Sequence, residues 1–210
     1  WLERCMSHLE KVPFKYGYEQ TFFPIVQGST YKDLRIQSAE YIANVGAQGN
    51  AIGGLSVGEP AEEMYAMTEV VCDILPEEKP RYLMGVGTPI NILENIALGV
   101  DMFDCVHATR MSRHGAFWTK TGRFSIKNAK FKTDKTALEK NCQCESCSNY
   151  SKSYIRHLIV ENETLGMRLL TIHNLHFLLN FMQEIRDSIQ KKEFLKFKKA
   201  FLKKFKSKNG

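Results

Sequence analysis

Three cysteines stand within six residues of one another in the second half of the sequence. They are Cys142, Cys144 and Cys147, and His173 follows further along the chain. Three thiolates and one imidazole complete a tetrahedral set around zinc and leave no position for water, so the pattern predicts one structural Zn²⁺ ion. His176 is the alternative fourth ligand, and buried free cysteines beside an unrelated histidine are the alternative to a metal site. Such clustering is typical of metal binding rather than of a secreted disulfide framework.

A carboxylate, Asp104, stands in the segment GVDMFDCVHATRMSRHG, where an apolar run gives way to a stretch rich in Arg and His. Arg110 and Arg113 follow it, and nearby cations favour the charged form of a carboxylate. An ionised carboxylate there could attack an anomeric carbon, while the arginines hold phosphates of a nucleic acid. The alternative is a structural salt bridge between Asp104 and one arginine. Asp101 is a second candidate nucleophile, but strand alternation places it on a different face.

Short apolar runs alternate with helix-like segments over residues 21–105. Repeated strand–helix units imply an α/β fold with parallel strands and right-handed crossovers. In an α/β barrel the carboxyl ends of the strands form the mouth of the active site, and four units are half of an eight-stranded barrel. The expected strands cover residues 22–26, 51–53, 82–85 and 102–105, and they end at Gln27, at Gly53 and Gly54, at Gly85 and at Asp104.

Helices are expected between these strands. Residues 31–45 place Leu34, Ala39 and Ile42 at helical spacing. Pro60 and Pro76 bracket the next helix. The expected helices cover residues 31–45, 62–75 and 90–98.

The pattern changes after Arg113. Residues 117–131 resemble a small antiparallel hairpin, and helices are expected over 151–160 and 167–186. Residues 191–206 read as a basic amphipathic helix whose phenylalanines serve core packing rather than RNA stacking. The apolar face of that helix consists of Phe194, Phe197, Phe201 and Phe205.

The positive charge is concentrated at the C-terminal end. Residues 191–210 hold nine lysines and one glutamate, whereas the net charge of the whole chain is +6. A solvated helix face is one interpretation, and binding of a polyanion such as RNA is the other.

Composition and length are those of a folded protein. With 210 residues and 43% hydrophobic side chains the chain can bury a real core. No apolar run is long enough for a transmembrane helix, and no signal-peptide region follows Trp1. We interpret the start without Met as a truncation or processing point, and we expect a cytoplasmic protein.

Several segments taken together resemble the tRNA-guanine transglycosylases. They stand in the family's order and spacing from Trp1 through the tail. The resemblance implies a (β/α)8 TIM barrel with a zinc-binding subdomain and C-terminal helices, and this chain is the C-terminal half of that fold. It implies three segments: a half-barrel at 1–116, the hairpin, zinc subdomain and helices at 117–186, and a basic helix at 187–210. The motifs are Gln27-Gly28, GGLSVGE at 53–59, YLMGVG at 82–87, DMFDCV at 101–106, TRxxRHG at 109–115 and the CxCxxC…His set.

The resemblance also implies a reaction. Asp104 matches the nucleophile that attacks C1′ of the wobble guanosine of tRNAs with GUN anticodons and forms a covalent tRNA intermediate. A 7-deazaguanine then replaces guanine, which requires the target base to leave its stack. Thr109, Arg110 and Arg113 match residues around the anticodon loop, a single-stranded target of the kind that RNA-binding proteins read.

The base pocket is implied in the same way. Gln27 and the N–H of Gly54 match the groups that hold O6 of the base, and glycine at 53 and 54 lets the backbone approach a flat ring. The resemblance implies that the Leu55 carbonyl accepts a hydrogen bond from the aminomethyl group of preQ1 and that Met84 lies against the face of the base. It also implies that Val57 gives a preference for preQ1 over the bulkier queuine.

The cysteines and His173 match the zinc ligands of the family, which selects His173 over His176. Tyr150, Tyr154 and His157 match an aromatic homodimer contact, with packing inside the chain as the alternative. One departure is Ala108, where the family usually has proline.

The first half of the family pattern is absent, and with it a general acid/base and a residue that reads the base edge. We therefore expect this chain to be inactive alone, with an exposed edge at its first strand. A non-catalytic tRNA-binding partner subunit is the first alternative, although it has no need of Asp104 together with Gln27 and the glycine pair. A zinc-dependent hydrolase is the second, and the closed ligand set argues against it.

Overall fold

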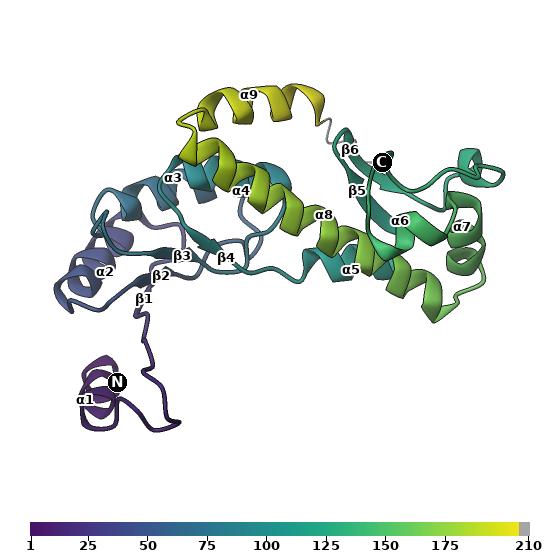
Figure 1. Cartoon of the computed structure of the whole chain (residues 1–210). Coiled ribbons are helices and arrows are strands. Elements are labelled where there is room, and N and C mark those ends of the chain that lie inside the picture. The colour runs from purple at the N-terminus through teal and green to yellow at the C-terminus, as the bar shows by residue number, and fades with distance from the viewer. Residues whose placement is uncertain (206–210) are drawn as a thin grey trace. The chain divides into compact units, whose positions relative to one another are not determined.

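The computed structural model describes residues 1–205, and it divides the chain into two compact units, Trp1–Cys105 and Val106–Gly210. Figure 1 shows the elements of both units. The predicted helix at 191–206 and the predicted segment 187–210 both extend past residue 205, so their last residues lie outside the described residues. The division into segments 1–116, 117–186 and 187–210 remains a prediction.

The first unit is built on a four-stranded sheet whose order is β1-β2-β3-β4, with every neighbouring pair parallel. The predicted α/β architecture with parallel strands is therefore confirmed. The strands are shorter than predicted. One reason is Pro24, which has no N–H to donate to a ladder and stands just before the first strand. The bounds are β1 (Ile25–Val26), β2 (Asn50–Ile52), β3 (Arg81–Leu83) and β4 (Met102–Phe103).

Three helices connect these strands, as the sequence predicts: α2 (Lys32–Asn44), α3 (Ala61–Cys72) and α4 (Pro89–Ala97). The start of α4 is fixed by Thr88, whose side chain accepts a hydrogen bond from the Asn91 N–H, and by proline at the first helical position. An additional helix, α1 (Leu2–Lys11), was not predicted, and it contains no buried residue.

The core of this unit lies between the sheet and its helices. Ala39 and Ile42 of α2 are buried there as predicted, whereas Leu34 is 46% exposed. The neighbouring Arg35, a residue that apolar periodicity overlooks, is fully buried in its place. The strands contribute the centre of this core through Val26, Ala51, Ile52 and Leu83.

The second unit combines a hairpin with helices. The predicted antiparallel hairpin is confirmed and pairs Phe117 with Phe124, although it is shorter than expected because residues 129–131 form a 3-10 turn. The helix at 167–186 is also confirmed, and it extends further at both ends. The elements are α5 (His107–Arg113), β5 (Ala116–Thr119), β6 (Gly122–Ser125), α6 (Glu145–Asn149), α7 (Lys152–Val160), α8 (Thr164–Gln190) and α9 (Phe194–Lys204).

A buried amide on α8 ties the unit together. Asn174 accepts a hydrogen bond from the Trp118 N–H at 3.0 Å and donates to the Ser112 hydroxyl at 2.7 Å and to the Ala116 carbonyl at 3.1 Å. A buried amide with its partners satisfied fixes one arrangement of the elements it joins. Asn174 thereby holds α5 and β5 against α8.

The phenylalanines of α9 pack against α8, as predicted. The rings of Phe181 and Phe201 have centroids 4.5 Å apart, and Phe201 stacks on Phe205 at 5.0 Å. Their apolar faces are therefore used within the unit. Across the described residues, 1–205, we find no helix with the length and apolar character needed to cross a membrane.

Candidate active site and metal centre

Asp104 follows directly after β4, at the carboxyl end of the strand, as predicted. Its Oδ1 accepts a hydrogen bond from the Tyr82 hydroxyl at 2.6 Å and another from the Gly85 backbone N–H at 2.9 Å. Tyr82 belongs to β3, the neighbour of β4 in the sheet, and Gly85 follows the end of β3. The parallel register therefore brings both donors to the carboxylate.

These two hydrogen bonds favour the ionised form of Asp104. The bond from Tyr82, followed by that from Gly85, lowers the pKa of the Asp104 carboxyl below its ordinary value, because both donors favour the ionised form. The same bond raises the pKa of the Tyr82 phenol. The sequence pointed instead to Arg110 and Arg113 as the source of this effect and gave no sign of Tyr82.

Asp101, the competing candidate, has a structural role. Its Oδ2 accepts the backbone N–H of Arg81 at 2.9 Å, and its own N–H donates to the Arg81 carbonyl at 2.9 Å. Arg81 is the first residue of β3. The Asp101 carboxylate is therefore bonded at the start of the strands, whereas Asp104 lies at their ends.

The Gln27 side chain lies over the two glycines after β2. A Cβ on Gly53 would come within 2.8 Å of Gln27 Nε2, and a Cβ on Gly54 would come within 2.6 Å of Gln27 Oε1. Gly54 also has a φ of +67°, which L side chains rarely adopt. The structure thus brings Gln27, Gly53 and Gly54 together at neighbouring strand ends, and the backbone conformation of Gly54 favours glycine there.

The loop that follows is closed by Glu59. Its carboxylate accepts the backbone N–H groups of Ser56 and Val57, the latter at 2.9 Å. Burial acts to raise the pKa of Glu59, but these backbone donors prevail and lower it. The loop presents Val57, which is 81% exposed, while Leu55 is buried beneath it. Met84 is half-buried just beyond β3.

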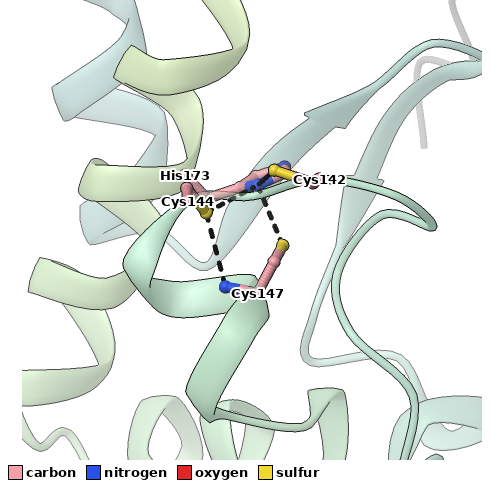
Figure 2. A group of neighbouring side chains, drawn as sticks. All are labelled: Cys142, Cys144, Cys147 and His173. Atoms are coloured by element: carbon pink, nitrogen blue, oxygen red, sulfur yellow. Dashed lines mark hydrogen bonds between the residues drawn. The ribbon is translucent and has the colours of Figure 1, made fainter.

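The second unit contains the predicted ligand set. The side-chain donor atoms of Cys142, Cys144, Cys147 and His173 all lie within 4.8 Å of one another. The three sulfurs are 3.7, 3.7 and 3.4 Å from His173 Nδ1. Figure 2 shows the imidazole on α8 facing the three sulfurs, with Cys147 on α6.

These distances fit a tetrahedral metal ion. Bonds of about 2.3 Å to sulfur and about 2.0 Å to nitrogen at tetrahedral angles separate sulfur from nitrogen by about 3.5 Å. The set closes all four positions. His176, the alternative ligand, instead bonds to Asn180 at 2.8 Å through its Nε2.

A backbone carbonyl fixes the histidine for this role. His173 Nε2 lies 2.8 Å from the Trp118 carbonyl oxygen. A carbonyl can only accept, so Nε2 carries the proton and Nδ1 directs its lone pair toward the sulfurs. Burial acts to lower the pKa of His173, while the neighbouring cysteines raise it to about 9, so a metal ion would have to replace a proton on Nδ1. The hydrogen bond between Cys144 and Cys147 lowers the pKa of the Cys144 thiol and raises that of Cys147, because the two thiols share one proton.

The residues expected to contact RNA lie on α5 in the second unit. Arg110 and Arg113 are exposed in the last turn of this helix. Thr109 is half-buried, and its hydroxyl donates to the Val106 carbonyl at 3.0 Å. Ala108, at the position where proline was expected, is buried and helical.

Sequence reasoning missed three groups that hold these sites: the Tyr82 phenol, the Glu59 carboxylate and the Trp118 carbonyl. Tyr82 stands within a short strand, which is only a weak signal of a hydrogen-bond donor, and Glu59 is the last residue of the GGLSVGE motif. A backbone carbonyl gives no sequence signal at all.

Comparison with known proteins identifies the family of the chain. The family model for queuine tRNA-ribosyltransferase matches residues 1–207. Queuine tRNA-ribosyltransferases of Macrococcus caseolyticus and Staphylococcus haemolyticus are 47% and 49% identical over 205 residues, or 98% of this chain and 53% of each relative. That of Dictyoglomus turgidum is 47% identical over 202 residues, covering 96% of this chain and 51% of the relative. The chain thus spans about half the length of these relatives, and it belongs to the queuine tRNA-ribosyltransferase family.

Proposed function

We propose that the chain is the C-terminal half of a tRNA-guanine transglycosylase, which replaces the wobble guanine of tRNA by preQ1. The single observation that carries this proposal is Asp104, held ionised at a strand end by Tyr82 and Gly85. The four parallel strands with their connecting helices are the half-barrel in this proposal, and the missing half completes a (β/α)8 barrel whose mouth contains Asp104.

The chemistry consists of two displacements at one carbon. Both hydrogen bonds to Asp104 go to Oδ1, so we assign the attack to Oδ2. The Oδ2–C1′ bond forms as the C1′–N9 bond breaks, and guanine departs with the electron pair and takes a proton from an acid in the missing half. The incoming base gives its N9 proton to the conjugate base of that acid, and the new C1′–N9 bond forms as the C1′–Oδ2 bond breaks and releases the Asp104 carboxylate. Two inversions give net retention.

The base lies at the ends of β1 and β2 in this proposal. Gln27 and the Gly54 N–H hold O6, the Leu55 carbonyl accepts the aminomethyl group of preQ1, and Met84 covers the ring. Gly53 and Gly54 have no side chains to block a flat base. The exposed Val57 restricts the space for larger substituents, which favours preQ1 over queuine.

The second unit supports binding of the RNA. We assign the anticodon loop to Thr109, Arg110 and Arg113, since exposed guanidinium groups bind phosphate well. Zinc at the closed cysteine–histidine site stabilises this unit. A cytoplasmic location follows from the tRNA substrate.

A homodimer through α7 completes the proposal. The rings of Tyr150 and Tyr154 stack with centroids 5.6 Å apart. Tyr154 is 41% exposed, and His157 is exposed one turn further along the same helix. Aromatic groups of this kind are enriched in protein interfaces.

The test uses the full-length protein that contains this chain, incubated with a tRNA carrying a UGU anticodon loop. We expect a denaturation-resistant protein–RNA band that disappears with Asp104→Ala. Asp101→Ala is the matched control, since it removes a carboxylate bonded at the other end of the strands, and it should retain the band. An adduct with Asp104→Ala would refute the assignment. Binding of tRNA without any adduct in the unaltered protein would favour the non-catalytic partner subunit.

A further inference from the structure

Arg35 is the only arginine of the described chain that is fully buried, and it lies beneath the candidate base pocket. It projects from the first turn of α2, where Gly28 lets the helix backbone approach closely. A Cβ on Gly28 would come within 2.8 Å of the Arg35 backbone nitrogen and 2.9 Å of the Leu34 carbonyl carbon. The glycine therefore sets the depth of the arginine beneath the strand ends.

The guanidinium of Arg35 donates to backbone carbonyls of two segments, residues 26–29 at the end of β1 and the turn after β2. Nη1 lies 2.7 Å from the Gly53 oxygen and Nη2 lies 3.0 Å from the Gly54 oxygen. Nε lies 2.6 Å from the Ser29 oxygen, and Nη1 is also 3.5 Å from the Val26 oxygen. One planar cation thus joins the end of β1 to the turn after β2.

A buried cation without a bonded anion requires an explanation. Within residues 1–205 Arg35 has no salt bridge, and the nearest charge that acts on it is that of Glu59. Burial lowers the pKa of Arg35, but a guanidinium retains its proton in proteins. Burying such a charge is costly, so the carbonyls that it holds must matter to this fold or to its site.

The bonded carbonyls orient the peptide groups of the pocket. The peptide unit is planar and trans, so its C=O and N–H point in opposite directions. Because the Gly53 oxygen points at Arg35, the N–H of Gly54 points away from it. A charged donor on the carbonyl also polarises the peptide and strengthens its N–H as a donor.

We propose that Arg35 is a positioning residue that orients and polarises the Gly54 N–H toward O6 of the purine. This inference rests on the proposed function. When the glycosidic bond breaks, the departing base gains negative charge, part of which is carried by O6. The chain of groups from Arg35 through the Gly53–Gly54 peptide to O6 stabilises that charge, in the manner of donors preorganised around an oxyanion.

The test compares guanine with 2-aminopurine, which lacks O6, as free bases binding to the full-length protein. We expect the unaltered protein to bind guanine more tightly. Arg35→Met should reduce the ratio of the two affinities by about fivefold, the effect of one well-formed hydrogen bond. Binding of 2-aminopurine should change much less. The turnover number for guanine exchange into tRNA should fall by at least the same factor as the affinity ratio.

Arg81→Met is the matched control, because Arg81 is also buried and also donates to carbonyls, those of Leu75 and Gly99, at the start of β3. It should lower the melting temperature without changing the affinity ratio. If Arg35→Met does not fold, Arg35→Gln is the second variant. Its side chain is neutral and shorter, and it should reduce the affinity ratio in the same way.

Two outcomes overturn the inference. One is an unchanged affinity ratio in a folded Arg35 variant, whether both affinities stay the same or fall equally, and the other is an altered ratio in Arg81→Met. Failure of the unaltered protein to bind guanine would instead refute the proposed function, so the two failures are distinguishable.

Discussion

The two units hold their chemically active side chains in opposite environments. In Trp1–Cys105, Asp104 and Gln27 are exposed at strand ends, and hydrogen bonds from neighbouring strands set the charge of the carboxylate. In Val106–Gly210, His173 is fully buried and its Nδ1 faces three cysteine sulfurs. Groups that must meet a substrate remain in solvent and depend on their neighbours for their charge state, whereas groups that hold a fold together are withdrawn from water.

The largest effect should come from the metal ligands. We expect His173→Ala to abolish zinc binding and to lower the free energy of unfolding of the second unit by several kcal/mol, part of the roughly 10–16 kcal/mol with which zinc folds short peptides. The substitution also leaves the buried Trp118 carbonyl without its 2.8 Å partner. Metal analysis and hydrogen exchange measured on the same sample test this.

His176→Ala is the matched control, since that imidazole bonds to Asn180, and it should retain one zinc per chain. In His173→Ala, amides of β5, β6 and α8 should lose protection while those of the four-stranded sheet keep it. Equal loss in both units would contradict the view that the metal stabilises only the second.

A smaller effect should come from the neighbour of Asp104. Tyr82→Phe removes the 2.6 Å hydrogen bond that lowers the pKa of the Asp104 carboxyl, so that pKa should rise. In the proposed mechanism the ionised carboxylate is the active form, so activity should be lost as the pH falls through its pKa. In the pH profile of kcat/KM of the full-length protein, the acid limb should therefore move to higher pH. At pH values above that limb, kcat/KM should change little.

Tyr65→Phe provides the comparison, because it deletes the same atom from a tyrosine that donates to Asn91 Oδ1 at 2.7 Å in the same unit. Its acid limb should stay in place. An unmoved limb in Tyr82→Phe would mean that the phenol does not govern the charge of Asp104.

The fold was predictable where the signal was local. Alternation of apolar runs with helical segments located the four strands, and the cysteine spacing located the metal ligands. Helix α1 was missed although Leu2, Met6 and Leu9 recur at helical spacing, and it contains no buried residue. Helix α2 was placed correctly but with the wrong buried side chain: apolar periodicity selected Leu34, while the carbonyls at the strand ends require Arg35.

The site was predictable only in part, for a physical reason. Asp104 and the glycine pair could be named from motifs, whereas the bond from Tyr82 to Asp104 depends on the register of β3 against β4. The carbonyls of Trp118 and Gly53 act through backbone atoms, which every residue type possesses. Such contacts become visible only when the elements are assembled.

The smallest predicted effect concerns surface charge in the second unit. Lys196, Lys199 and Lys203 are exposed, and at 3.6 residues per turn they occupy the face of α9 opposite Phe197 and Phe201. The exposed ion pair of Lys196 with Glu193, at 3.1 Å, contributes little. This lysine face of α9 is therefore a positively charged surface. It lies on the second unit, whose buried groups support the fold.

If that surface contacts tRNA phosphates, replacing the three lysines by glutamine should weaken tRNA binding and reduce the slope of log K against log salt concentration by about 2, since each neutralised single-strand phosphate contributes about 0.7. Lys11, Lys15 and Lys32, exposed in the first unit, provide a control with the same change in net charge. Equal slopes for the two triple variants would show that only net charge matters and that α9 is a solvated face. A smaller slope for the α9 variant alone would extend RNA recognition beyond Arg110 and Arg113.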